Sequence, residues 1–100
     1  MIMFSNYILL MNTEIDGVIH DGKYIMSSTR REVAEAFIEP YVARNSVRYY
    51  KDHNPREMRD YYYLEDKDGA TIKVYFIIIE TPVLDDLSDI PEYVLYAPEV

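Results

Sequence analysis

Two histidines have the clearest capacity for chemistry in this chain, and each stands beside an aspartate, in His20-Asp21 and Asp52-His53. Such neighbours could form a His–Asp acid/base pair, or together a metal site of two histidines and a carboxylate. Neither histidine has a ligand spacing such as H-E-x-x-H, and both aspartates suit turns. The sequence therefore predicts no catalytic residue, no metal and no cofactor. A small enzyme or ligand-binding module that uses His20 or His53 in a cleft stays open as an alternative.

The stretch from residue 44 to residue 63 interleaves basic and aromatic side chains. Arg and Lys could contact phosphates there while Tyr rings stack on bases, as on surfaces that bind single-stranded nucleic acid. Asp52, Glu57 and Asp60 stand among them, and the net charge of −8 repels polyanions. RNA or single-stranded DNA binding is therefore an alternative function, and nucleic acid is not the expected partner. The residues that would carry it are Arg48, Tyr50, Lys51, Arg56 and Arg59.

The end of the chain has the opposite character. From residue 80 to residue 100 it holds six acids and no base. Carboxylates complement a basic surface or imitate phosphates, and tyrosines anchor interfaces at low entropic cost. The alternative is a solvated rim whose Leu, Ile and Tyr residues pack on a sheet. We expect a partner-binding surface made by Asp85, Asp86, Asp89, Glu92, Tyr93 and Tyr96.

Length and composition predict one globular domain. One hundred residues with 49% hydrophobic and 28% charged side chains can bury one core. The absence of cysteine excludes disulfides and thiolate chemistry, and is typical of a reducing compartment. Residues 1–11 lack the basic start of a signal peptide, and no apolar run is long enough to cross a bilayer. We expect a soluble, cytoplasmic protein whose single domain, residues 1–100, ends in an acidic extension over 81–100.

The first elements that must position these residues are a hairpin and a helix. The hairpin is predicted to pair about 2–11 with about 18–27, because one of two Asp-Gly pairs, at 16–17 and 21–22, suits its turn. The other Asp-Gly pair would then be a bulge or a loop.

The helix is predicted to begin at Thr29, which has the spacing of a capping box with Glu32. Apolar residues at three-and-four spacing follow as far as Val42. Pro40 predicts a kink or a new short turn, with the helix finished by Asn45.

The second half of the chain is predicted to be mostly strand. We expect a short strand over 46–50, a loop over 51–54, and one helical turn over 56–60 after Pro55. A hairpin over about 60–80 follows.

The register of that hairpin can be tested against its side-chain pattern. A three-residue turn at Lys67-Asp68-Gly69 sets Leu64 opposite Ile72 and Tyr63 opposite Lys73, which keeps the faces distinct. The run from Ile77 to Ile79 is apolar on both faces, which predicts a strand that is central in the sheet or covered on both sides. Residues 84–90 are spaced for one or two helical turns, and 93–96 for an edge strand.

The predicted fold class is α+β: an antiparallel sheet of about four or five strands, with one main helix packed on one face, in the order β-β-α-β-β-β. A homodimer through an exposed face of Tyr61, Tyr63 and Tyr75 is a further prediction.

A short acidic chain with a hairpin followed by the segment S-S-T-R-R-E-V-A-E-A-F-I resembles small accessory proteins of bacteriophages and other mobile elements. The resemblance covers Tyr7 to Val42. It implies a protein that binds a host protein in the host cytoplasm; such proteins include inhibitors of CRISPR or restriction nucleases that imitate DNA charge. We therefore expect a non-enzymatic inhibitor or modulator that docks on a basic surface of a larger host protein, such as a defence nuclease; a nucleic-acid-binding surface would be one such surface.

Overall fold

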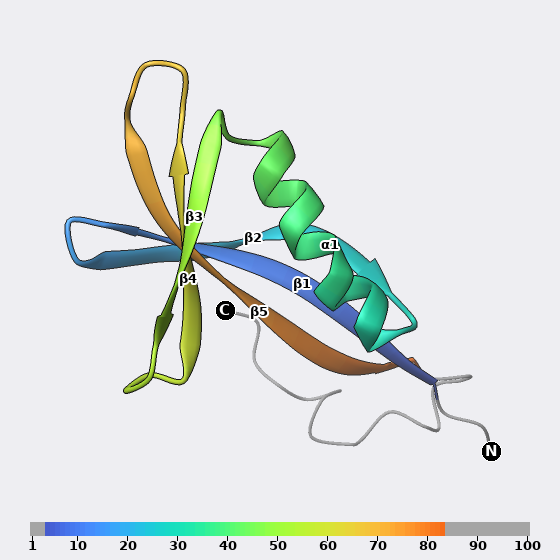
Figure 1. Ribbon diagram of the computed structural model, residues 1–100. Helices are drawn as coiled ribbons and strands as arrows, with labels where there is room; N and C mark the ends of the chain where they lie inside the picture. The colour runs from blue at the N-terminus through green and yellow to red at the C-terminus, as the bar shows by residue number, and fades with distance from the viewer. Residues whose placement is uncertain (1–3, 84–100) are drawn as a thin grey trace.

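The computed structural model describes residues 4–83, which form five strands and one helix (Figure 1). The order of elements confirms the predicted β-β-α-β-β-β succession and the α+β class. The predicted helical turns over 84–90 and the predicted strand over 93–96 lie outside the described residues. The elements are β1 (Phe4–Ile15), β2 (Val18–Ser28), α1 (Arg31–Arg44), β3 (Arg48–Asn54), β4 (Arg59–Glu65) and β5 (Thr71–Val83).

The strands form one antiparallel sheet in the order β2-β1-β5-β4-β3. β5 pairs with β1 from Lys73 to Val83, but with β4 only from Thr71 to Val74. The hairpin of β3 and β4 therefore diverges from β5, and Figure 1 shows it crossing the other strands at a steep angle. β5 lies between β1 and β4, as its run of isoleucines predicted.

The first hairpin turns at Asp16-Gly17, with backbone φ angles of 52° and 80°. Two consecutive positive φ angles are typical of a type I′ turn, whose twist matches that of the flanking strands. Gly22 lies inside β2, where the register with β1 shifts between the pairs at Met11 and Thr13. One Asp-Gly pair is thus the turn and the other a bulge, as predicted. β1 continues four residues beyond its predicted end.

The predicted start of the helix is wrong by one residue, because the capping box placed the N-cap at Thr29. Arg30 is the N-cap without a side-chain cap hydrogen bond, and the helix begins at Arg31. Glu32 accepts a hydrogen bond from Arg30 Nε at 2.8 Å instead of forming a capping box with Thr29. The helix continues as one element through Pro40 to Arg44.

The segment between the helix and β4 also differs from expectation. Residues 51–54, predicted as a loop, are the second half of β3, and no helical turn follows Pro55. The amides of Arg56 and Glu57 instead donate to Asn54 Oδ1 at 3.0 and 3.2 Å. This Asx turn reverses the chain directly into β4, because the Asn54 side chain accepts hydrogen bonds from two turn amides and so stabilises the turn without a helix.

The hairpin of β4 and β5 has the predicted register. Leu64 lies opposite Ile72 and Tyr63 opposite Lys73. Asp66 N donates to the carbonyl of Ala70, which encloses a three-residue turn with Gly69 at φ 83°. The faces of the two strands are therefore fixed as the alternation predicted.

Helix α1 packs on one face of the sheet, where Figure 1 shows it lying over β1 and β2. Val42 of the helix meets Met11, Tyr62, Leu64 and Val74 of the sheet in the buried core. The helix is anchored by Glu39, which accepts hydrogen bonds from the hydroxyls of two sheet tyrosines. These are Tyr49 at 2.7 Å and Tyr62 at 3.3 Å.

Candidate binding surface

The opposite side of β3, β4 and β5 carries a second set of tyrosines. Side chains alternate along a strand, so with Tyr62 and Leu64 in the helix-side core, Tyr61 and Tyr63 point to the other side. The register places Tyr50 of β3 opposite Tyr63, and ring contact brings Tyr75 of β5 to Tyr61. We call this side of the three strands the helix-free face.

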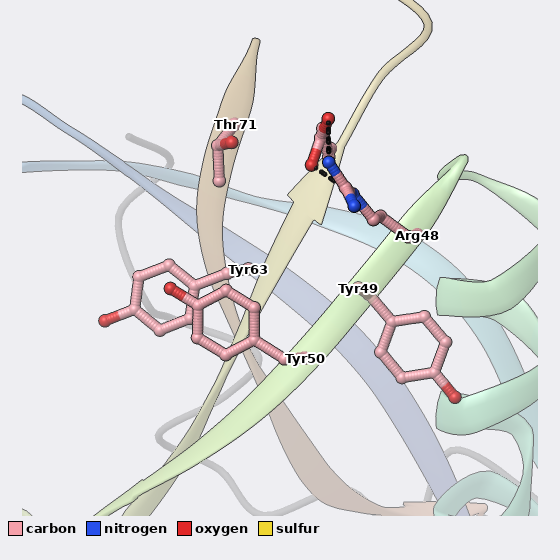
Figure 2. Close-up of a pocket in the computed structure, with 6 residues that line it drawn as sticks. Arg48, Tyr49, Tyr50, Tyr63 and Thr71 are labelled. Atoms are coloured by element: carbon pink, nitrogen blue, oxygen red, sulfur yellow. Dashed lines mark hydrogen bonds and ion pairs between the residues drawn. The ribbon is translucent and has the colours of Figure 1, made fainter. Parts of the chain in front are cut away.

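Tyr50 and Tyr63 stack on each other. Their ring centroids are 4.7 Å apart and the planes differ by 7°. Figure 2 shows the two rings parallel, with Tyr49 pointing away toward the helix. Tyr50 is 61% exposed, because it belongs to the edge strand β3 and only its inner ring face meets Tyr63.

Lys73 lies beside two of these rings. Its Nζ is 4.2 Å from the ring centroid of Tyr61 and 5.9 Å from that of Tyr63. The same ammonium is 2.8 Å from Glu14 Oε2. This carboxylate oxygen is buried and lacks a well-aligned hydrogen bond among the described residues, so the charge of Lys73 compensates it. Glu14 in turn raises the pKa of Lys73 above its ordinary value.

Arg59 covers the remaining ring. Its guanidinium carbon lies 3.8 Å from the ring centroid of Tyr75, and the rings of Tyr75 and Tyr61 meet edge to face at 5.6 Å. The Tyr61 hydroxyl donates to Glu57, which raises the pKa of that tyrosine. Tyr61 and Tyr75 are consequently only 5% and 6% exposed. The predicted exposed face of Tyr61, Tyr63 and Tyr75 is therefore wrong at two of its three residues.

Two hollows adjoin the stacked pair on this face. One, of about 350 Å³, is lined by Tyr50, Tyr63 and Thr71 together with the ion pair of Arg48 and Glu65 (Figure 2).

The second hollow, of about 390 Å³, shares Tyr63 and Thr71 with the first and reaches Glu14, Asp16 and Lys73 near the turn of β1 and β2. The helix-free face is thus a shallow, tyrosine-lined surface between two hairpin tips.

Arg48 and Glu65 form a fork-like pair beside the rings. Arg48 Nε lies 2.6 Å from one carboxylate oxygen and Nη2 lies 3.1 Å from the other. Each group stabilises the charged form of its partner: the pKa of Glu65 is lowered and that of Arg48 raised. The cation nearest the hollow is thereby already engaged by an anion.

The five residues predicted for nucleic-acid binding do not share one surface. Arg48, Tyr50 and Arg59 belong to the helix-free face, whereas Lys51 lies on the helix side, 5.7 Å from the Tyr62 ring centroid. Arg56 lies in the turn between β3 and β4.

Three of those cations also form ion pairs with carboxylates. Glu65 pairs with Arg48, Asp60 is 3.5 Å from Lys51, and Glu57 is 3.8 Å from Arg59. The interleaved stretch is therefore divided between two faces and largely neutralised.

The two histidines lie far apart in the sheet. His20 belongs to the edge strand β2 and His53 to the opposite edge strand β3. His53 Nδ1 is 2.7 Å from Asp60 Oδ1, and this hydrogen bond lowers the pKa of Asp60. The partner of His53 is thus a cross-strand residue rather than Asp52, which lies within β3 and not in a turn. Residues 4–83 contain no group of three or more His, Cys, Asp or Glu that could hold a metal ion.

The six residues predicted for partner binding lie outside the described residues. What sequence reasoning missed is the role of Lys73 and Arg59 as covers of tyrosine rings; the alternation of β4 and β5 was the signal that placed them on that face.

No helix within residues 4–83 is long and apolar enough to cross a membrane. Comparison with protein families, curated proteins and solved structures finds no match to this chain.

Proposed function

We propose that the protein is a non-enzymatic binding protein, an inhibitor or modulator that docks through its acidic C-terminal residues on a basic surface of a larger protein. A basic surface that binds nucleic acid would suit such carboxylates best, because they imitate the phosphates that it normally contacts. The proposed contacts are the six residues already named from the sequence, Asp85, Asp86, Asp89, Glu92, Tyr93 and Tyr96.

The observation that carries this proposal is where the surplus charge lies. All ten Lys and Arg residues, with thirteen of the eighteen acids, fall within residues 4–83; five acids and no base fall within 84–100. Within the described part, carboxylates pair with many of the cations. These pairs involve Arg30, Arg31, Arg48, Lys51, Arg59 and Lys73. The electrostatic attraction for a basic partner therefore comes mainly from residues 84–100.

The test is a differential capture from lysate of the source cells. The baits are the wild-type protein, a variant with Asp85→Lys, Asp86→Lys and Asp89→Lys, and a matched variant with Glu32→Lys, Glu35→Lys and Asp68→Lys. Each triple reversal changes the net charge from −8 to −2. The control residues are exposed, and exposed ion pairs such as that of Arg31 and Glu35 add little to stability.

We expect a basic protein that wild-type and matched baits retain and the C-terminal variant loses. Reconstitution with that purified protein should give a complex that weakens steeply with salt, and that excess double-stranded DNA displaces. Equal retention by all three baits, or a complex indifferent to salt, contradicts the proposal.

A further inference from the structure

The tyrosines and cations of the helix-free face form a continuous ladder. Each neighbouring pair is in aromatic or cation–π contact, over centroid distances from 3.8 to 5.9 Å. Cation–π pairs are attractive because the ring face is negative. The members of the ladder, in order, are Tyr50, Tyr63, Lys73, Tyr61, Tyr75 and Arg59.

The two ends of this ladder differ. At one end the guanidinium of Arg59 covers the ring of Tyr75. At the other end Tyr50 stacks its inner ring face on Tyr63, and among the described residues no cation covers its outer face. Tyr50 is on an edge strand and 61% exposed, so a side chain from another molecule can reach that ring.

The charges around Tyr50 favour the binding of a cationic group to this ring. Arg48 is held by Glu65 at 2.6 Å, so the nearest guanidinium offers little net positive charge to an anion. Asp52 is exposed and lies two residues farther along β3 on the same face as Tyr50, roughly 7 Å away. A ring face with a carboxylate beside it is the combination that binds guanidinium groups, which stack on the ring and donate to the carboxylate.

We propose that the outer face of Tyr50, together with the Asp52 carboxylate, is the docking point for an arginine side chain of the partner protein. The proposal rests on the proposed function for the basic character of that partner. Arginine fits better than lysine, because a planar guanidinium can lie parallel to the ring and still direct N–H groups at Asp52. The ladder would then end in an arginine at both ends, one from the chain and one from the partner.

The test uses a hexa-arginine peptide as the probe, with the neutral hexa-citrulline peptide as its isosteric control. Ring resonances of ¹³C-tyrosine-labelled protein, assigned by single Tyr→Phe variants, are followed by NMR during titration. We expect hexa-arginine to shift the Tyr50 ring resonances while hexa-citrulline leaves them in place. Equal shifts with both peptides, or none with hexa-arginine, would overturn the proposal.

Substitutions of Tyr50 show whether binding requires an aromatic ring or only an apolar side chain at this position. Tyr50→Leu should weaken hexa-arginine binding roughly two- to fivefold, which is the range of exposed cation–π pairs, whereas Tyr50→Phe should bind like the wild type. Asp52→Asn should also weaken binding. The matched control is Tyr24→Leu on the other edge strand, where Tyr24 is 59% exposed; it should change nothing. Equal affinities for Tyr50→Leu and Tyr50→Phe would refute a role for the ring.

The C-terminal triple reversal distinguishes a failure of this inference from a failure of the proposed function. If both are right, that variant binds hexa-arginine more weakly but still shows the Tyr50 shift at saturation. If the proposed function alone fails, lysate capture is the same for all baits and the Tyr50 shift persists. If the Tyr50 site alone fails, lysate capture still depends on the C-terminal acids and the ring resonances do not move.

Discussion

Tyr62 shows how one side chain couples the fold to pH. Its ring is in the core, and its hydroxyl donates to Glu39, which is also the acceptor for Tyr49. Burial first, and the nearby carboxylate second, raise the pKa of Tyr62 to about 12. A phenol whose folded-state pKa exceeds its unfolded value of about 10 keeps its proton more tightly in the folded state. Its contribution to stability is therefore present below pH 10 and is lost as pH rises toward 12.

The first prediction follows from the direction of this pKa shift. The free energy of unfolding of the wild-type protein should fall between pH 10 and pH 12, by about 1–3 kcal/mol from Tyr62 alone, since one pKa unit corresponds to about 1.4 kcal/mol. Tyr62→Phe should be less stable at pH 8 but show a flatter decline. Urea unfolding at intervals from pH 8 to pH 12, followed by circular dichroism, measures both slopes. Parallel declines in the two proteins would contradict the assignment.

The second prediction concerns the pair of Lys73 and Glu14. Lys73→Met leaves the buried oxygen of Glu14 without its counter-charge, so it should cost about 1–3 kcal/mol of unfolding free energy, less than a fully buried pair because both side chains are partly exposed. Adding Glu14→Gln removes the stranded charge and should recover part of the loss. A double-mutant cycle by chemical denaturation gives the coupling energy. Strictly additive effects would show that the ammonium does not compensate the carboxylate.

Turns fix the registers of the hairpins, and Gly69 is the clearest case. Its φ of 83° lies in the left-handed region, and a Cβ there would meet nothing within 4 Å, so any cost of substitution is conformational rather than steric. Gly69→Ala should therefore destabilise the protein by about 1 kcal/mol, and Gly69→Asn by less, since asparagine tolerates this region. Thermal unfolding of the two variants measures the difference. An alanine variant as stable as the wild type would argue against this turn geometry.

The elements that sequence patterns predicted are those whose signals are local. The register of β4 with β5 follows from alternation that Leu64 and Ile72 satisfy only with a three-residue turn. The first hairpin was predicted from its two Asp-Gly pairs, but the sequence alone did not decide which pair forms the turn. The end of β3 was missed because residues 51–54 are polar and typical of a loop. On an edge strand such residues are tolerated, since one strand edge and much of the side-chain surface meet water.

The candidate surface was predictable only in part, because sequence patterns report local alternation and not contacts between strands. Alternation separates Tyr61 and Tyr63 from Tyr62, but it does not tell whether the helix-free rings are covered. Arg59 and Lys73 cover them through contacts that depend on how far β4 diverges from β5, which is a property of sheet twist and not of local sequence. The sequence therefore predicted too much exposed tyrosine surface.

At the scale of the whole molecule, the net charge and the positions of the individual charges have separate consequences. Net charge sets the field far from the protein, whereas the field at a contact depends on charges within about one Debye length. The C-terminal and matched triple reversals reach the same net charge of −2 and differ only in where the charges lie. Their comparison therefore separates net charge from location.

The last prediction uses ionic strength to make that separation. At about 10 mM salt the Debye length is about 30 Å, comparable with the two shorter dimensions of the molecule, 28 and 27 Å, so both variants should associate more slowly with the purified partner by similar factors. At about 150 mM it falls to about 8 Å, and only the C-terminal variant should remain slow. Stopped-flow association rates at the two salt concentrations measure this. Equal rates for the two variants at 150 mM would mean that the acids of residues 85–89 act only through net charge, and that the partner contacts another surface.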